Sequence, residues 1–347
     1  MMRMLCAAMM LTALSGCYKA HEGTPAARQT VQFTAVADHT KGIIGTTSYP
    51  TDEPFRLSAF YGSDTTDAMA VRFIDSDIVT YDEGRAAWRT ESDYYWPENG
   101  TLLFYSFSPL SAPAIITQEQ GVIADYSIET VEDAQRDFCY SENIESCYQH
   151  SYNVPIVFRH ALSMHCFKIR PTRNLNERIV EGFVVQDKTM EFVLDSLDLT
   201  GVFCSGRFYQ KPCGWSVKPG SDTDYRLFEA TPGENFATEC DIRNIPIAKE
   251  VKTLLLIPQY LQGHGCKLAV YYHMHVHTVT RDGISGETKT EDYNVPCSDV
   301  VFDLGDLISR WDIAHKYSYH ISLDYNKATL DIATTDWTET QELFTDE

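Results

Sequence analysis

The feature that most constrains the fold of this sequence is a series of short segments in which apolar and polar residues alternate. Clear examples are residues 31–36, 55–60, 102–107 and 317–323, and no long segment shows a sustained helical period. Successive side chains of a strand point to opposite faces, so such alternation is typical of half-buried β-strands. Turn-forming residues separate many of these segments, as at 98–100 (Glu-Asn-Gly). The sequence predicts an all-β fold.

The strand pattern continues along the chain, with a break near residue 170. Residues 171–176 are polar, and the alternation restarts at Ile179. A chain of 347 residues is long enough for about two domains of common size. Strands that follow one another without helices favour antiparallel Greek-key sandwiches. We therefore predict two tandem β-sandwich domains, at residues 31–170 and 171–347. Further strands are expected at 71–81, 154–162, 164–169, 182–186, 190–199, 201–209, 254–259, 266–280, 293–295 and 330–333, and a short helix or extended turn at 300–311.

The N-terminus resembles the signal of a bacterial lipoprotein. Arg3 precedes an uncharged apolar stretch, residues 4–14, which is too short for a permanent transmembrane helix. The following Leu-Ser-Gly-Cys resembles the lipobox, in which a peptidase cuts before the cysteine and the thiol carries a lipid. We expect a signal peptide at 1–16, lipidation of Cys17 by acyl chains such as palmitate, and a polar tether at 17–30. An ordinary secretory signal with a chance cysteine is the alternative.

The charge of the chain excludes one class of partner. The formal net charge is −21, and loss of Arg3 with the signal leaves 27 basic against 49 acidic residues, or −22. Such a field repels phosphate backbones, so nucleic acid is not expected as a partner. The acidic residues are spread along the chain, which is typical of a solubilising surface.

Eight of the ten cysteines lie beyond Cys17. An oxidising envelope favours disulfides, and Cys139 with Cys147 and Cys204 with Cys213 are the locally plausible pairs. Buried free thiols are the alternative. The other four cysteines are Cys166, Cys240, Cys266 and Cys297.

Several segments, in order, resemble the fimbrillin-like lipoprotein family of the Bacteroidia. Residues 94–97 (Tyr-Tyr-Trp-Pro) and 102–109 resemble its YYWP and FYAYSP segments, and 157–164 resembles its F-x-HALSK segment. Residues 255–259 resemble its LIPQ segment, and 311–337 resembles its C-terminal pattern of Trp, alternating Tyr and Trp. With the lipobox, these pieces cover nearly the whole chain.

The resemblance implies two tandem transthyretin-like Greek-key β-sandwich domains and a role in a cell-surface pilus, or fimbria. In stalk subunits of the family a protease removes the first strand after an Arg or Lys, and a neighbouring subunit donates a strand to the groove. Here the first strand is 31–36, flanked by Arg28 and Arg56 and followed by Lys41. Arg56 is the preferred cleavage candidate and Arg28 the second, and the region after Trp311 is the candidate donor strand. The alternative is that these basic residues are only solvated charges.

The expected function is therefore that of a structural subunit or anchor of a pilus that contributes to adhesion. Its expected partners are other pilus subunits by donor-strand exchange, the outer membrane through the lipid, and host protein or glycan. Whether the subunit is stalk, tip or anchor stays open. A glycan-binding surface lipoprotein or tip adhesin is the alternative, with residues 94–96 as a stacking platform, although large aromatic residues at such positions favour a core role.

One pattern suggests metal chemistry. His273, His275 and His277 alternate along an expected strand and share a face. Two histidines at i and i+2 can share a zinc ion, but the first and third lie roughly 13 Å apart. No completing ligand stands out in the sequence, so a solvated polar face is the preferred interpretation. We predict no enzyme activity, no catalytic residue, no cofactor and no metal site.

Overall fold

The computed structural model describes residues 29–37, 49–63, 71–147, 153–233, 236–325 and 327–337. These residues form strands apart from two short 3-10 helices, η1 (Glu132–Ala134) and η2 (Leu304–Asp306), which confirms the all-β class. Among them, no helix has the length and apolar character needed to cross a membrane. The predicted signal peptide, Cys17, Arg28, Lys41 and nearly all of the tether lie outside the described residues.

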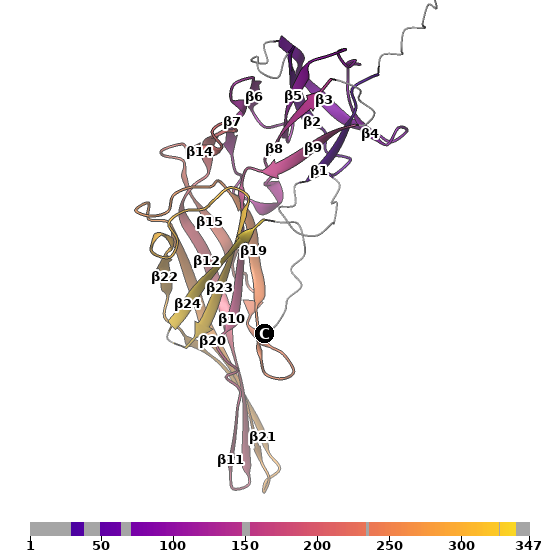
Figure 1. The fold of residues 1–347 in the computed structure, drawn as a ribbon. Helices are drawn as coiled ribbons and strands as arrows, with labels where there is room; N and C mark the ends of the chain where they lie inside the picture. The colour runs from indigo at the N-terminus through magenta and orange to yellow at the C-terminus, as the bar shows by residue number, and fades with distance from the viewer. Residues whose placement is uncertain are drawn as a thin grey trace, which may run out of the picture.

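The first part of the chain closes into a barrel with the strand order β1-β4-β3-β2-β5-β8-β9 (Figure 1). Its strands are β1 (Phe33–Ala37), β2 (Phe55–Gly62), β3 (Val71–Asp82), β4 (Ala87–Thr90), β5 (Thr101–Ser108), β8 (Cys139–Ser146) and β9 (Val154–His160). Aromatic rings fill its interior, with Phe33 edge-on to Phe104 at 5.7 Å and Phe55 edge-on to Phe158 at 5.1 Å. Such pairs add to the hydrophobic gain from burial.

The second part of the chain builds two sheets that share one core. One sheet has the order β19-β10-β23-β24, from β19 (Lys249–Leu256), β10 (Ser163–Pro171), β23 (His315–Asp324) and β24 (Lys327–Asp336). The other has the order β11-β12-β20-β21, from β11 (Glu177–Glu181), β12 (Val184–Phe203), β20 (Lys267–Asp282) and β21 (Thr288–Pro296), with β15 (Asp222–Glu229), β16 (Phe236–Ala237) and β22 (Val300–Asp303) on its margins. Phe167 and Tyr319 of the first sheet and Phe192 and Val270 of the second are buried together. A hairpin-like pair, β17 (Glu239–Cys240) and β18 (Pro246–Ile247), forms a separate two-stranded sheet that contacts β10.

A small middle sheet joins the two parts. Its order is β14-β13-β7-β6, from β14 (Gly214–Val217), β13 (Ser205–Tyr209), β7 (Gly121–Ser127) and β6 (Ala114–Thr117). In Figure 1, β7 and β14 lie between the barrel and the two larger sheets. The core beneath it contains Phe138 from the first part together with Phe208, Ile257 and Trp337 from the second. Segments from both halves of the sequence therefore share one core.

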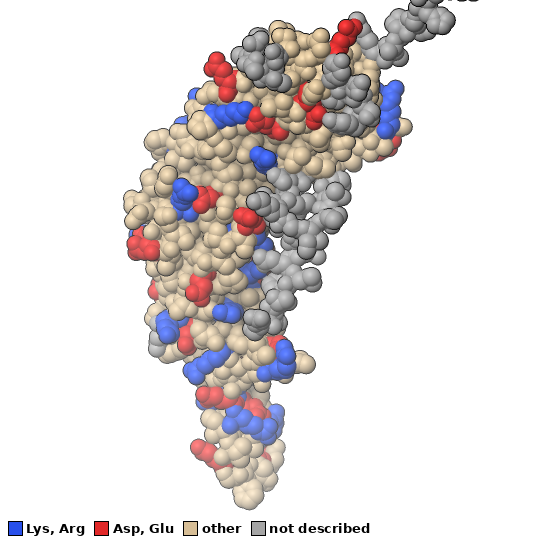
Figure 2. All heavy atoms as spheres, viewed as in Figure 1, with Lys and Arg blue, Asp and Glu red and all other residues tan. Residues whose placement is uncertain are grey.

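A narrow arm extends from the end of the molecule opposite the barrel (Figure 1). It consists of β11, β21 and the lengths of β12 and β20 that pair with them. Apolar side chains are exposed near its turns, including Phe183 (69% exposed) and Ile284 (77%). Figure 2 shows acidic and basic side chains interspersed along this face, and both signs on the arm, where Asp187 pairs with Arg178 and Arg281.

The structure joins three segments that were expected to be separate strands. The segments expected at 182–186, 190–199 and the start of 201–209 form one strand, β12, because the polar residues between them pair with β20 in the solvated arm. Gly201 sits in the left-handed region (φ 71°) at a register shift, where it bends the strand without ending it. The polar region 109–150 contains β6, β7 and β8.

The pairing of strands also departs from the antiparallel arrangement expected from the sequence. β1 runs parallel to β9, and β10 runs parallel to β23. The partners of each parallel pair are far apart in the chain, so no hairpin turn sets their direction. The segment expected to hold a short helix or turn, 300–311, contains β22 and η2.

Candidate functional site

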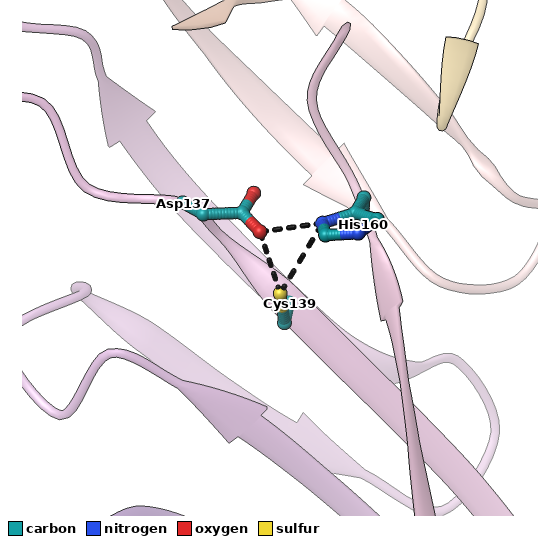
Figure 3. Close-up of side chains that lie close together, drawn as sticks. All are labelled: Asp137, Cys139 and His160. Atoms are coloured by element: carbon teal, nitrogen blue, oxygen red, sulfur yellow. Dashed lines mark hydrogen bonds and ion pairs between the residues drawn. The ribbon is translucent and has the colours of Figure 1, made fainter. Parts of the chain in front are cut away.

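Three metal-ligating side chains meet where the barrel adjoins the middle core. Cys139 is the first residue of β8 and His160 the last residue of β9, and these two residues are directly opposite in the antiparallel pair. Opposite residues of neighbouring strands hold their side chains close together. Asp137, two residues before Cys139, points into the same space (Figure 3).

The donor atoms of this Asp137–Cys139–His160 cluster lie within hydrogen-bond range. His160 Nδ1 is 2.5 Å from Asp137 Oδ2, and the Cys139 thiol donates to the same oxygen at 3.0 Å. Cys139 Sγ lies 3.9 Å from His160 Nδ1. The second carboxylate oxygen, Asp137 Oδ1, is buried without a hydrogen-bond partner. Both donors therefore use one oxygen, while the other is desolvated and unsatisfied.

The imidazole of the cluster is held by the C-terminal end of the described chain. The indole of Trp337, the residue after β24, stacks on the His160 ring with centroids 3.7 Å apart and planes 9° apart. The Trp337 amide donates to Ala314 O at 2.9 Å. Next to His160, Ala161 O accepts from the Trp215 indole at 2.6 Å. The stacked Trp337 indole restricts the plane of the His160 ring, and the Trp215 hydrogen bond holds the backbone next to it.

Two buried tyrosines stand near the cluster. Burial raises the pKa of Tyr49 and of Tyr126 well above the ordinary value, and the negative charge of Asp137 raises both pKa values further. Both phenols therefore stay neutral and donate hydrogen bonds, Tyr49 to Ser108 Oγ at 2.6 Å and Tyr126 to Arg136 O at 2.8 Å. The cluster has an uncharged, largely apolar wall on this side.

The chemistry of the cluster suits metal binding better than catalysis by a cysteine–histidine dyad. A thiolate, an imidazole and a carboxylate are the ligands that zinc takes in proteins. Activation of a cysteine nucleophile requires a base that accepts the thiol proton. Here the near imidazole nitrogen already engages the carboxylate, and the thiol donates to that carboxylate as well.

A second feature is a cavity of about 700 Å³ at the edge of the middle sheet. Trp215, Tyr260 and Trp311 line it together with Arg310 and Asp312. Tyr260 is 64% exposed, and the Arg310 guanidinium lies 5.9 Å from its ring centroid while binding Asp312 at 2.8 Å. Aromatic side chains lie beside charged groups in this cavity, whereas the glycan-binding alternative drawn from the sequence had placed the aromatic platform at residues 94–96.

Comparison with known proteins gives the family. Residues 44–337 match the profile of the family described as fimbrillin-like. The chain belongs to the fimbrillin-like family. Among solved structures, a candidate cell adhesion protein from Bacteroides ovatus is 14% identical and superimposes with a TM-score of 0.51, over 91% of this chain and 100% of that one. One from Bacteroides uniformis is 11% identical with a TM-score of 0.46, over 89% and 99%. A search of curated proteins finds no match.

The three alternating histidines of this fimbrillin-like chain do not converge on one point. His273 Nδ1 bonds Asp195 at 2.8 Å, His275 Nδ1 bonds the Asn294 side chain at 2.9 Å, and His277 Nδ1 bonds Asp292 at 2.7 Å. Among the described residues, the Asp137–Cys139–His160 cluster is the one group of three ligands whose atoms all lie within 4.8 Å of one another. Sequence reasoning missed it because strand register, which places Cys139 opposite His160, is not visible in residue spacing.

The eight cysteines in the described part of this fimbrillin-like chain form no disulfide bond with one another. The expected Cys139–Cys147 bridge is wrong, because the two residues bracket β8 and lie roughly 26 Å apart along it. A disulfide needs Cα atoms within about 7 Å. The expected Cys204–Cys213 bridge is also absent. Cys204 Sγ donates to Ser221 O at 3.1 Å, and Cys213 Sγ lies 3.2 Å from Tyr140 Oη.

The candidate cleavage residue Arg56 and the aromatic residues 94 and 96 make contacts within the barrel. Arg56 lies in β2 between β3 and β5, half-buried, and donates to Ser76 O at 2.7 Å. Tyr94 and Trp96 pack against the barrel core, Tyr94 on Phe73 and Trp96 on Phe104, which supports the core interpretation of these aromatic residues.

Proposed function

We propose that this fimbrillin-like protein is a structural subunit or anchor of a cell-surface pilus, assembled by β-strand addition and contributing to adhesion. Membership of the fimbrillin-like family supports a place at the cell surface and pilus-associated partners. The fold shared with the Bacteroides ovatus structure agrees with this assignment.

The observation that carries the proposal is the way β1 closes the barrel. β1 pairs with β9 along five residues but with β4 at one position, Phe33 opposite Trp88. Phe33 and Ala35 are buried, so the strand supplies alternate side chains to the core. Removal of β1 would leave an open groove between β4 and β9, and an unpaired edge accepts an added strand of matching alternation.

Processing after a basic residue is part of the proposal. A cut after Arg28 leaves β1 in place, whereas a cut after Arg56 or Lys41 releases it. Arg56 is paired with Phe107 and Ile78 on both sides, so a protease would reach its peptide bond only before β2 joins the barrel. Cleavage at Arg56 therefore has to precede or accompany folding. Without any cleavage, the subunit would keep its lipid at Cys17 in the outer membrane and act as an anchor or cap.

We extend the proposal to the domain organisation. We propose two tandem transthyretin-like Greek-key domains, predicted from the sequence at 31–170 and 171–347. Because the barrel ends at His160 and β10 (Ser163–Pro171) pairs within a sheet of the second part, we propose residues 161–162 as the boundary between them. The middle sheet takes strands from both sides of this boundary. The two domains would therefore share one core and unfold together.

Glycan binding is the second candidate function, and the cavity beside Tyr260 favours it. Sugar rings stack on exposed aromatic faces, and their hydroxyls bind charged and amide groups. Tyr260, Trp215, Arg310 and Asp312 supply both kinds of contact in one hollow. Saturable binding of a soluble glycan, lost in Tyr260→Ala and kept in Tyr95→Ala, would support this function. Equal binding by both variants would contradict it.

The primary proposal is tested on outer-membrane fractions, probed with antibody to this protein on a denaturing gel with and without boiling. A heat-sensitive ladder is expected of a stalk subunit, because strand-exchanged joints persist until the sandwich melts. A single lipid-labelled band at full mature mass is expected of an anchor. A single band that carries no lipid and never associates with other subunits would overturn the proposal.

A further inference from the structure

A buried oxygen without a partner marks the Asp137–Cys139–His160 cluster as incomplete. Asp137 Oδ1 is buried and accepts no hydrogen bond, while Oδ2 receives both the His160 and Cys139 contacts. A buried acceptor left unsatisfied costs about 1–3 kcal/mol, and more when it is charged. A cation bound at the carboxylate would remove this cost.

We propose that Asp137, Cys139 and His160 bind one Zn²⁺ ion. The three side chains offer one sulfur, one nitrogen and one oxygen ligand, a mixture that zinc accepts and that calcium and magnesium do not. A thiolate and a carboxylate together carry two negative charges, so the complex with Zn²⁺ is neutral. Neutrality suits a half-buried site, where an uncompensated charge is costly.

The geometry requires a small rearrangement. With bonds of about 2.3 Å to sulfur and about 2.0–2.2 Å to nitrogen and oxygen, tetrahedral ligand atoms lie roughly 3.4–3.6 Å apart. The atoms here are separated by 3.9 Å (Sγ to Nδ1), 3.0 Å (Sγ to Oδ2) and 2.5 Å (Nδ1 to Oδ2). Moving the Asp137 carboxylate by roughly 1 Å makes room for the ion. Asp137 lies before β8 rather than inside a strand, so its backbone is not held by a ladder.

Proton balance follows from the same contacts. Binding releases the Cys139 thiol proton to solvent. The His160 proton that faces Asp137 Oδ2 from Nδ1 in the metal-free cluster moves to Nε2 by exchange with solvent, so that Nδ1 can coordinate the ion. The fourth position is left for water or for a partner's side chain, as in zinc sites with three protein ligands.

The surroundings hold the ligands in place. The Trp337 indole covers one face of the His160 ring, and Cys139 and His160 sit on paired strands. These contacts restrict the orientation of the His160 ring and of the Cys139 side chain before any ion binds. The acidic chain, at net charge −21, also raises the local concentration of cations.

The test uses the full-length protein, purified from membranes in detergent, stripped with chelator and titrated with Zn²⁺ or Co²⁺. We expect one zinc per chain after desalting, and a thiolate-to-cobalt charge-transfer band with Co²⁺. Cys139→Ser should abolish the band and weaken zinc binding by at least about ten-fold. Asp137→Asn, which preserves side-chain size, should weaken zinc binding and keep the band.

Two matched variants serve as controls. Cys204→Ser removes another half-buried thiol, and His273→Gln removes a histidine that also pairs with an aspartate, His273 with Asp195 at 2.8 Å. Both should retain one zinc. Thermal unfolding in chelator checks that every variant is folded.

The proposal is overturned if the parent protein shows no cobalt–thiolate band, or if Cys139→Ser binds zinc as tightly as Cys204→Ser. The zinc proposal does not depend on the proposed role in a pilus, and neither result of this test supports or contradicts that role.

Discussion

His160 and Trp337 stack face to face, with ring centroids 3.7 Å apart, although one ends a barrel strand and the other follows the last strand of the sandwich. The stack therefore joins the barrel to the end of the last described strand, β24. Trp337 is 6% exposed and belongs to the middle core, so this contact is part of the shared interior.

Truncation of this contact should be costly. We expect Trp337→Ala to lower the free energy of unfolding by about 3–5 kcal/mol, because a large buried aromatic side chain is replaced by a cavity. Urea unfolding followed by circular dichroism measures the change. Tyr325→Ala, at a residue 43% exposed, is the control and should cost far less. Equal losses in the two variants would contradict the predicted cost of removing the buried Trp337 indole.

Stability should fall as the solution is acidified, because of one buried histidine. His165 is fully buried beside Ser163 Oγ (2.8 Å) and Tyr319 Oη (3.1 Å), and burial lowers its pKa to about 3. The unfolded chain binds this proton near pH 6.5 and the folded chain does not, so the stabilisation is complete above about pH 6.5 and is lost as pH falls toward 3.

The measurement is a series of urea unfolding curves between pH 7 and pH 4. Where the unfolded chain binds one more proton than the folded chain, the free energy of unfolding changes by about 1.4 kcal/mol per pH unit. His165→Gln should reduce the slope by up to that amount. His315→Gln, on a half-buried residue, should leave most of the slope, and a parent-like slope in His165→Gln would rule out this histidine as its source.

Thiol reactivity should separate the cysteines by burial. Cys213 is exposed and should react quickly with an alkylating reagent in the native protein. Burial raises the pKa of Cys147 to about 11 and of Cys266 to about 12, so neither forms the reactive thiolate at neutral pH. Mass spectrometry of alkylated peptides, with and without denaturant, measures this order. Any of the eight thiols found oxidised under non-reducing conditions would contradict the free state described here.

Gly121 should tolerate no side chain. Its φ is +67°, and an added Cβ would lie 2.5 Å from Gln210 Oε1, which accepts a hydrogen bond from Val122 N at 2.9 Å. Gly121→Ala therefore adds a clash to a backbone strain of about 1–2 kcal/mol. Gly220→Ala, at φ +77° in open space, isolates the strain alone. Thermal unfolding should show a larger loss for Gly121→Ala, and equal losses would rule out the clash.

Individual strands were predictable where apolar and polar residues alternate in the sequence, although β2 and β23 have buried residues on both faces. β2 and β23 follow the expected segments closely, because their apolar residues alternate and pack into a core. β12 was not predictable as one strand, since its arm half is solvated and carries no alternation. Parallel pairing of β1 with β9 depends on contacts between distant segments, which no local pattern records.

The candidate site, too, was only partly predictable from the sequence. The segment containing His160 was singled out from the sequence, but Cys139 was considered only as half of a disulfide. Their meeting depends on the register of β8 against β9, which places the two residues opposite each other. A shift of one residue would have pointed the two side chains to opposite faces.

The unbroken course of β12 and β20 has a mechanical consequence. The two strands are paired from Val184 with Asp282 near the arm tip to Thr200 with Lys267 in the body. β12 alone spans roughly 66 Å at 3.3 Å per residue. A force along the strand axis that pulls β12 against β20 loads the hydrogen bonds of this ladder in shear, all together, instead of opening them one by one. The arm therefore behaves as a stiff lever continuous with the sandwich, and a pull at its end is felt in the core.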